Sequence, residues 1–416
     1  MYWRKYSTKE INNIIFNAIN KNINYREQTI LGLPASYLDP ITFNNDTSFL
    51  KDRAFLTSLI TNANHIGCHT LECSEPSFIG TQEIEKDLIR ICSEEILSGK
   101  KGLQDGYISS GGTEANIQAM WIYRNYFLKE FNAKMDEISV LFTEDTHYSI
   151  PKGVNILNLH SLIVKVNNEN RSVKLNLLQK EISSAQKNGT KYFIVILNMG
   201  TTMFGSIDDI DGIINILDKQ KVQYKLHVDG AFGGFIYPFT KPGNKYSFKN
   251  PNITSFTIDA HKMLQAPYGT GIFLIRKGYM KYVLTEEAKY IKGKDYTICG
   301  SRSGANAIAA WIIIHMYGSR GWKEKMNHIN KRTDKFCEKL NKLNISYYRN
   351  PYINIIALRS DDIPTEIALK FHLVPDSYNE SPKWWKIVVM DHVKERGLNK
   401  LILDIREYRT RKSMDI

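Results

Sequence analysis

Short apolar runs and longer stretches of helical spacing alternate through the middle of the chain. The short runs are rich in Val, Ile, Phe and Tyr and are bounded by turn residues, as in "EISVLFTED", "KYFIVILNMG", "YKLHVDGAFGGFI", "ITSFTIDA" and "GTGIFLIRK". Between them, "KLNLLQKEISSAQKNG" and "DDIDGIINILDKQKV" have the apolar spacing of amphipathic helices. Strands that alternate with helices predict a mostly parallel sheet with helices on both faces. Continuous apolar runs such as "FIVIL" suit strands that are buried on both faces. We therefore expect one large α/β domain over residues 75–304.

The segments on either side of this domain have different patterns. Residues 1–74 are irregular and helical. The stretch "GTQEIEKDLIRICSEEIL" predicts an amphipathic helix at the start of the large domain, with Thr81 as its N-cap. Residues 305–416 begin with a long helix, continuous or broken, and go on to strand-like "INIIALR" and "WKIVVMDHV" with helical "TEIALKFHL" between them. This pattern predicts a smaller C-terminal α+β domain.

Composition and charge exclude several classes of protein. Of the 416 residues, 43% are hydrophobic and 24% are charged, which is typical of a folded chain. The net charge of +12 favours anionic ligands, but the basic residues are scattered and no basic run indicates a nucleic-acid partner. The five cysteines form no CxxC pair, so neither a disulfide framework nor a metal site is predicted. No signal-like or membrane-spanning apolar stretch is present, which favours a cytoplasmic protein without a membrane partner.

A glycine pair after one expected strand favours an anion-binding turn. The stretch "SSGGTEAN", residues 109–116, joins a strand-like piece to the start of a long helix. Gly111 and Gly112 let the backbone approach an anion closely, and Ser110 or Thr113 can add a hydroxyl donor. The stretch matches neither the dinucleotide-binding nor the Walker pattern, and glycine turns before helices are common. It therefore indicates a specific site only in combination with other residues.

Chemically active side chains follow the ends of several other expected strands. Asp229 in "HVDGAFGG" either caps a turn or pairs with a pyridinium nitrogen, and His147 in "TEDTHYS" is either structural or stacks on a flat ring. Thr201 and Thr202 either form a local turn or face the site. Lys262 in "SFTIDAHKM" is either a solvated lysine or an amine that forms a Schiff base. Open α/β sheets bind ligands at the carboxyl ends of their strands, so this combination predicts a pyridoxal 5'-phosphate site.

The same segments resemble a known family. In order along the chain, "YISSGGTEANIQAMWIYRN", "TEDTHYS", "NMGTTMFGSIDDID", "LHVDGAFGGFIYPF", "SFTIDAHKM" and "TICGSRSGANAIAAW" are similar to group II pyridoxal-phosphate-dependent amino acid decarboxylases. The resemblance looks nearest to the branch of archaeal tyrosine/aspartate, bacterial histidine and plant serine decarboxylases. It implies pyridoxal 5'-phosphate as cofactor and the fold-type-I architecture of aspartate aminotransferase. It also implies a homodimer with active sites at the subunit interface.

The resemblance implies a role for each matching residue. Lys262 would hold the cofactor as an internal aldimine, with His261 beside it. Asp229 would pair with the pyridine nitrogen, Ala231 would lie under the ring, and His147 would stack over its other face. The cofactor's phosphate would be held by Gly111, Gly112, Thr113 and Ser301, the last of these in its own subunit or in the partner.

The implied reaction is the decarboxylation of an L-amino acid to a primary amine and CO2, through an external aldimine and a quinonoid. Thr201 would lie near the reacting substrate. A tyrosine on a loop of the other subunit would return a proton to the substrate Cα. In "EEAKYIKGKDYT" this residue is expected to be Tyr290, with Tyr296 as its rival.

The chain departs from the family pattern where substrate contacts gather. His65 and His69, in "NANHIGCHTLECSEPSFIGTQ", stand where many relatives have an Asn-x-Gly-Asp-Pro-like segment. His65 is either a substrate contact or a loop histidine with an ordinary hydrogen bond. Tyr268, in "APYGTGIFL", is expected to reshape the pocket wall. Aromatic or imidazole substrates are favoured over acidic ones, but these residues do not determine which amino acid is used.

Two other classes of function are compatible with the same scaffold. One is a carbon–carbon lyase of the sphingosine-phosphate lyase kind, or a decarboxylating aldehyde synthase. "GTT" at residues 200–202 favours decarboxylation over the lyase reaction. The other is a binding protein without catalytic activity, against which the intact set of Lys262, Asp229 and His147 argues.

Overall fold

A seven-stranded sheet forms the centre of the computed structural model, which describes residues 2–25, 27–33, 36–43, 50, 52–71, 75–285 and 294–414. All of its strand pairs are parallel except the two made by β8, which runs against both of its neighbours. This confirms the mostly parallel central sheet. In spatial order the strands are β2 (Gln104–Ser109), β8 (Gly271–Arg276), β7 (Ile253–Asp259), β6 (Gln223–Asp229), β5 (Tyr192–Asn198), β3 (Ile138–Thr143) and β4 (His160–Val164).

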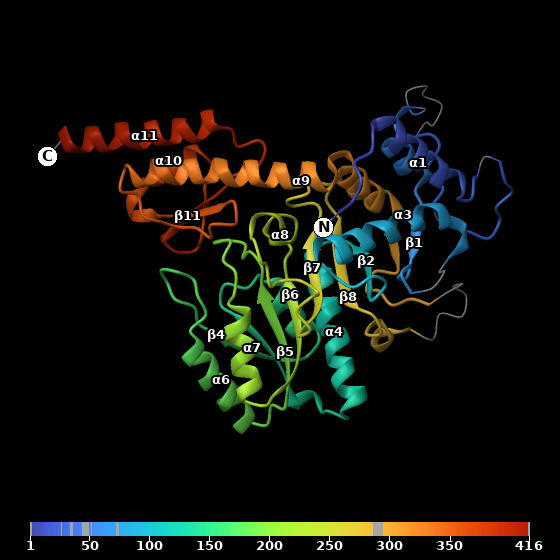
Figure 1. Cartoon of the computed structure of the whole chain (residues 1–416), viewed down its shortest axis with the longest axis horizontal. Coiled ribbons are helices and arrows are strands. Elements are labelled where there is room, and N and C mark those ends of the chain that lie inside the picture. The colour runs from blue at the N-terminus through green and yellow to red at the C-terminus, as the bar shows by residue number, and fades with distance from the viewer. Residues whose placement is uncertain are drawn as a thin grey trace.

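Apolar cores lie on both faces of this sheet. Along β5, Phe193 and Val195 enter one core, whereas Ile194 and Ile196 enter the other. Successive residues of a strand point to opposite faces, so the continuous apolar run is explained by burial on both sides. The helices that contribute to these cores are α6 (Leu175–Lys187) and α7 (Ile210–Lys219) on one side, and α4 (Gly112–Glu130) and α5 (Ser149–Ile156) on the other (Figure 1).

The N-terminal segments pack beside the start of the large sheet. They comprise α1 (Thr8–Asn20), α2 (Ala54–Thr61) and β1 (Asn64–Ile66), which pairs with the distant β9 (Ser301–Ser303). The next helix, α3 (Ile79–Arg90), continues into a π-helical turn at Ile91–Ile96. Its N-cap position is occupied by Phe78, so the expectation for Thr81 was wrong. A 3-10 turn at Pro76–Phe78 starts the helical path earlier, and Thr81 is buried inside α3.

The C-terminal part is built on a long helix and a small antiparallel sheet. Helix α9 (Gly304–Asn341) runs from the N-terminal helices to this sheet (Figure 1). The strands, in spatial order, are β10 (Tyr347–Tyr348), β11 (Ile355–Arg359), β13 (Trp384–Val388) and β12 (Val374–Pro375). They share a separate apolar core with α10 (Thr365–Lys370) and α11 (Glu395–Met414). The expected α+β character is present, while the boundaries 1–74, 75–304 and 305–416 stay predictions.

The remaining short elements complete the chain path. They are the helix α8 (Tyr237–Thr240) and the 3-10 turns Met135–Glu137, Gly233–Phe235, Met280–Val283 and Ser360–Asp362. Among the described residues, no helix is both long and apolar enough to cross a membrane.

A kink in α9 accommodates the N-terminal segment. Gly318 has φ +64° and ψ 171°, which breaks the helical path. A Cβ at this position would lie 2.8 Å from the backbone N of Lys5 and 2.7 Å from its Cβ. The backbone of Trp3 accepts a hydrogen bond of 3.1 Å from the N–H of Ser319 beside the kink. Glycine is therefore required both by the backbone conformation and by the close approach of another segment.

We expect Gly318→Ala to lower the free energy of unfolding by about 2–3 kcal/mol, because the new methyl group meets strain and the backbone of Lys5. Urea unfolding followed by circular dichroism measures the change. Gly321→Ala is a matched control in the same helix, since its Cβ would meet only Tyr317 at 3.8 Å or more. That variant is expected to be neutral or more stable by up to about 1 kcal/mol. Equal loss in both variants would contradict the explanation.

Candidate active site

The carboxyl ends of five strands meet at one edge of the large sheet. Strand β2 leads to the glycine pair, β3 to His147, β5 to Thr201, β6 to Asp229 and β7 to Lys262. These strands are mutually parallel, so their carboxyl ends lie on the same side. A cavity of about 290 Å³ opens there. Ten of the expected site residues line it: Ser110, Gly111, Gly112, Thr113, His147, Thr201, Asp229, Ala231, His261 and Lys262.

The glycine pair lies where α4 begins, close to Asp259 and Ala231 in the cavity lining. Gly111 has φ +152°, a conformation that favours glycine, and α4 begins at Gly112. A Cβ on Gly112 would lie 2.8 Å from Asp259 Oδ2 and 3.2 Å from Ala231 Cβ. The first backbone N–H groups of a helix lack partners within the helix and carry positive partial charge. The turn can therefore bind an anion that enters the cavity.

Lys262 lies three residues beyond the end of β7 and faces an acidic neighbour. Its Nζ lies 3.1 Å from Asp259 Oδ2, and His261 Nε2 lies 3.4 Å from the same oxygen. Burial raises the pKa of Asp259, and the charges of Lys262 and His261 oppose this change. Sequence reasoning missed Asp259, although "DAHK" places an acid three residues before the lysine. The ion pair between Lys262 and Asp259 thus fixes the position of the amine in the lining of the cavity.

Asp229 is held by two N–H donors at the end of β6. Its Oδ1 accepts from the backbone N–H of Ala231 at 3.1 Å, and its Oδ2 accepts from Asn116 Nδ2 at 2.9 Å. The carboxylate is 7% exposed and lines the cavity. Burial without donors would be costly for a carboxylate, so these hydrogen bonds favour a defined orientation of the group. Asn116, on α4, was not recognised in the sequence.

His147 lines the same cavity as the glycine turn and lies next to the exposed Tyr148. Its Nδ1 lies 2.9 Å from Ser149 Oγ, and its ring lies 4.1 Å from the ring of Tyr148, centroid to centroid. Burial lowers the pKa of His147, although the charge of Asp229 opposes this. A neutral imidazole can present a flat face to a ligand ring.

Thr201 lines the cavity, but its hydroxyl is used within its own loop. Thr201 Oγ1 lies 2.7 Å from Ser206 Oγ and accepts from the N–H of Ser206 at 3.1 Å. These contacts favour the local-turn alternative for its side chain. The preceding Asn198 also lines the cavity, and its Nδ2 donates to Asp208 Oδ2 at 2.8 Å. Burial raises the pKa of Asp208 to about 7.

The structure does not bring His65 into this cavity. His65 is 1% exposed, and its two ring nitrogens lie 2.6 Å from Glu85 Oε2 and 2.7 Å from Thr81 Oγ1. This arrangement favours the alternative of a histidine with ordinary hydrogen bonds. Its loop position concealed the burial, because the partners come from α3.

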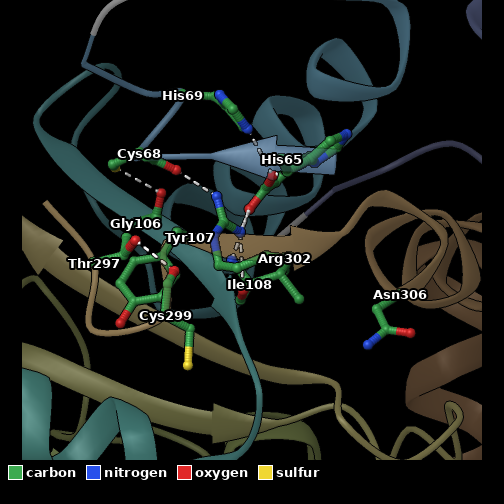
Figure 2. A network of polar contacts seen from close by, with 12 residues as sticks. His65, Cys68, His69, Gly106, Tyr107, Ile108, Thr297, Cys299, Arg302 and Asn306 are labelled. Carbon is green, nitrogen blue, oxygen red and sulfur yellow. Dashed lines mark hydrogen bonds and ion pairs between the residues drawn. The ribbon is translucent and has the colours of Figure 1, made fainter. Parts of the chain in front are cut away.

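Glu85 is the centre of a buried polar network around His65. Figure 2 labels four other members of the network: His65, His69, Ile108 and Arg302. Glu85 accepts from Arg302 Nη1 at 2.5 Å and from the N–H of Ile108 at 2.8 Å, and His69 Nε2 lies 3.2 Å away. Burial alone would raise the pKa of Glu85, but Arg302 and the histidines outweigh it and lower the pKa well below its usual range. Burial also lowers the pKa of His69 to about 4.

This network was not expected from the sequence, which predicted no metal site. His65, His69 and Glu85 place possible ligand atoms within 4.8 Å of one another. Arg302 already supplies a positive charge to Glu85 and donates to the carbonyl of Ile108 at 2.9 Å. The network thus ties β9 and the segment around His65 to β2, directly before the glycine turn.

Three further candidates lie apart from the cavity or outside the described residues. Ser301 is exposed on β9 and does not line the cavity of its own chain, and Asn64 donates to its Oγ at 3.3 Å. Tyr268 is 90% exposed, with its ring 5.6 Å from that of His261. Tyr290 lies outside the described residues. Its rival Tyr296 is buried, and its carbonyl accepts from Gln118.

We expect Glu85→Ala to lower the free energy of unfolding by about 3–5 kcal/mol, because it leaves the charge of Arg302 buried without a carboxylate. Glu83→Ala, on the same helix, removes an exposed contact with Lys21 and is expected to cost less than about 1 kcal/mol. Urea unfolding compares the two variants. Similar losses would show that the buried pair contributes no more than a surface pair.

The unfolding free energy should depend on the protonation of Asp208. The folded protein raises the pKa of this group from 3.8 to about 7 and so binds its proton more tightly than the unfolded chain does. The resulting stabilisation is fully present below about pH 4 and is lost as the pH rises to about 7, up to about 4 kcal/mol in total. Asp208→Asn should remove this pH dependence, whereas the exposed control Asp361→Asn should retain it. Urea unfolding at several pH values measures both.

Comparisons with known proteins agree with this geometry. The family model "Pyridoxal-dependent decarboxylase conserved domain" matches residues 56–347. A tryptophan decarboxylase of Clostridium sporogenes is 47% identical over 407 residues, which cover 98% of each chain. A histidine decarboxylase of Vibrio campbellii is 30% identical over 78% of this chain and 79% of its own length.

A solved structure with the same fold is the L-methionine decarboxylase of a Streptomyces species. It aligns with a TM-score of 0.68 at 17% identity and covers 96% of this chain and 93% of its own. The expected resemblance to histidine decarboxylases is confirmed. The sequence motifs did not indicate a tryptophan decarboxylase, yet the tryptophan enzyme is more similar to this chain than the histidine enzyme, at 47% against 30% identity. The chain belongs to the pyridoxal-dependent decarboxylases, enzymes that remove CO2 from an amino acid with pyridoxal 5'-phosphate as cofactor.

Proposed function

We propose that this enzyme decarboxylates an aromatic L-amino acid, with L-tryptophan as the substrate and tryptamine as the product. The observation that carries this proposal is the 47% identity to a tryptophan decarboxylase over 98% of both chains. The ring of Tyr148 at the cavity and the partly buried Phe232 in its lining support an aromatic substrate side chain. A cytoplasmic location remains part of the proposal.

The residues of the cavity fit the cofactor. Asp259 Oδ1 and His261 Nδ1 are buried in its lining and have no hydrogen-bond partner among the described residues. A side chain at Gly112 would fill the space between Asp259 and Ala231. When bound, pyridoxal phosphate supplies an electron sink for the charge left on Cα as CO2 departs. In this proposal Lys262 binds its aldehyde carbon, Asp229 its ring nitrogen, and the glycine turn its phosphate.

A second cation stands near Lys262 and was not recognised in the sequence. Lys386, on β13, donates to the carbonyl of Thr202 at 3.2 Å. Burial and the charge of Lys262 lower the pKa of Lys386. In the proposed function, this ammonium group attracts the carboxylate of the incoming amino acid from the side of the small sheet.

We also propose a homodimer in which each chain completes the other's site. Ser301 is exposed on its own chain, which supports a contact with the partner's phosphate site rather than its own. The exposed apolar side chains of Leu56 and Leu59 on α2 and of Ile298 near β9 are consistent with a covered surface. Tyr290 remains the proposed donor of the proton to Cα.

The substrate assignment is tested by steady-state assays of CO2 and amine release from tryptophan, tyrosine, phenylalanine, histidine and aspartate. We expect kcat/KM for tryptophan to exceed that for histidine and aspartate at least about 100-fold, because an aromatic pocket leaves a polar side chain without partners. Lys262→Ala should lose both activity and the borohydride-reducible link to the cofactor.

A preference for aspartate or histidine would refute the aromatic assignment while leaving the decarboxylase assignment intact. Cleavage of a phosphorylated amino alcohol without CO2 release from any amino acid would favour the lyase alternative.

A further inference from the structure

The amide of Asn116 is the branch point of a buried hydrogen-bond network behind the cavity. Asn116 is 1% exposed and lies on α4, one turn after the glycine pair. Its Nδ2 lies 2.9 Å from Asp229 Oδ2 and 2.9 Å from Ser149 Oγ, and its Oδ1 lies 2.9 Å from His227 Nε2. All three hydrogen bonds of the amide are thus made to groups on two other elements, β6 and α5.

In the branch that contains His227, each group donates a hydrogen bond to the next, and the last bond is donated by Asn116 to Asp229. An amide oxygen only accepts, so His227 must donate from Nε2 to Asn116 Oδ1. Nδ1 of the neutral His227 then accepts from Ser255 Oγ at 2.6 Å, since burial lowers the pKa of His227 to about 4. Ser255 in turn accepts from the hydroxyl of Tyr123. Every hydrogen bond in this series polarises the Asn116 amide in the sense that strengthens its donation to the carboxylate.

The other branch fixes the tautomer of His147. The backbone N–H of Ser149 donates to His147 Nδ1 at 3.2 Å, so this nitrogen carries no proton in the neutral ring. Ser149 Oγ lies 2.9 Å from the same unprotonated nitrogen and donates to it, while Asn116 Nδ2 donates to that hydroxyl and so orients it. The imidazole proton of His147 is therefore on Nε2.

We propose that Asn116 is a positioning residue for two groups at once: it orients the carboxylate of Asp229, and it orients the Ser149 hydroxyl that donates to Nδ1 of His147. This inference rests on the proposed roles of Asp229 at the ring nitrogen and of His147 at the ring face. One amide thereby couples the group that holds the ring proton to the group that covers the ring. Asn116 itself acts only through these neighbours.

The other charged groups near this pair do not replace the amide. Asp259 interacts with Asp229 only through charge, and Lys262 and Lys152 act in the same way on His147. Thr257 Oγ1 lies 3.1 Å from His227 Nε2 but makes no contact with Asn116, so it offers a matched control.

The test compares Asn116→Leu, which keeps the side-chain volume and removes all three hydrogen bonds, with Thr257→Val. With pyridoxal phosphate, Asn116→Leu should lower kcat about 10- to 100-fold with KM changed less than about threefold. Thr257→Val should stay within about threefold of the original enzyme. Thermal unfolding of both variants serves to establish that each is folded.

A cofactor methylated on its ring nitrogen separates positioning from a general structural role, because its positive charge does not depend on Asp229. With it, Asn116→Leu and the original enzyme should reach the same kcat within about threefold. Persistence of the full deficit would overturn the proposal, as would an unchanged kcat with the natural cofactor.

Nitrogen-15 spectra of selectively labelled histidines in the apoprotein provide a readout that needs no activity. His147, assigned through His147→Gln, should show a protonated Nε2 in both proteins, because the backbone N–H of Ser149 donates to Nδ1 in each. The Nδ1 resonance should shift in Asn116→Leu, because the Ser149 hydroxyl is no longer held in place to donate to it. An unchanged Nδ1 resonance in Asn116→Leu would refute the second branch. If the original enzyme decarboxylates no amino acid, the proposed function fails, while these spectra still decide whether Asn116 orients the Ser149 hydroxyl at His147.

Discussion

The burial of a carboxylate at the end of a parallel strand is the constraint on which the site depends. Asp229 lies between the glycine turn, His147 and Lys262, and it is almost fully removed from solvent. A carboxylate in such a place is tolerated only when N–H donors face it. The end of β6 supplies one donor, and α4 supplies the other through Asn116. The same helix begins at the glycine turn, so in the proposed binding mode one element would act at both ends of the cofactor.

The pattern of apolar residues was sufficient to predict the central fold, because the spacing of apolar residues along a strand or helix shows directly which of its faces are buried. The alternation of apolar runs and helical spacing gave a sheet covered on both faces, and "FIVIL" became β5 with a core on each side. The apolar run of β8 resembles those of the parallel strands, so the signal for its reversal lies in the preceding stretch "APYGTG", whose glycines are typical of a hairpin. Thr81 was misplaced because a local capping preference competed with tertiary contacts to Asn22 and His65.

The candidate site was predictable to the extent that its residues follow strands. Gly111, His147, Asp229 and Lys262 were found in this way and line one cavity. Asn116, Asp259 and Lys386 were missed because their roles depend on partners in other segments, and no spacing along the chain records those contacts. The burial of His65 was missed for the same reason. The sequence placed it in a loop near the substrate contacts, whereas its partners Glu85 and Thr81 on α3 hold it in a buried position. Sequence patterns thus locate groups at strand ends better than the groups that support them.

The Glu85–Arg302 pair shows why such supporting groups are ionic despite their cost. Burying two charges gains little net stability, but each charge must then find hydrogen bonds in fixed directions. Arg302 donates to Ile108 and Gly67, and Glu85 accepts from Ile108. These bonds join three distant segments at a point two residues before Ser110. An apolar contact in the same place would be compatible with sliding of the segments, whereas directional bonds to β2 define where the glycine turn begins. The position of the glycine turn therefore depends on a network whose side chains lie outside the cavity lining.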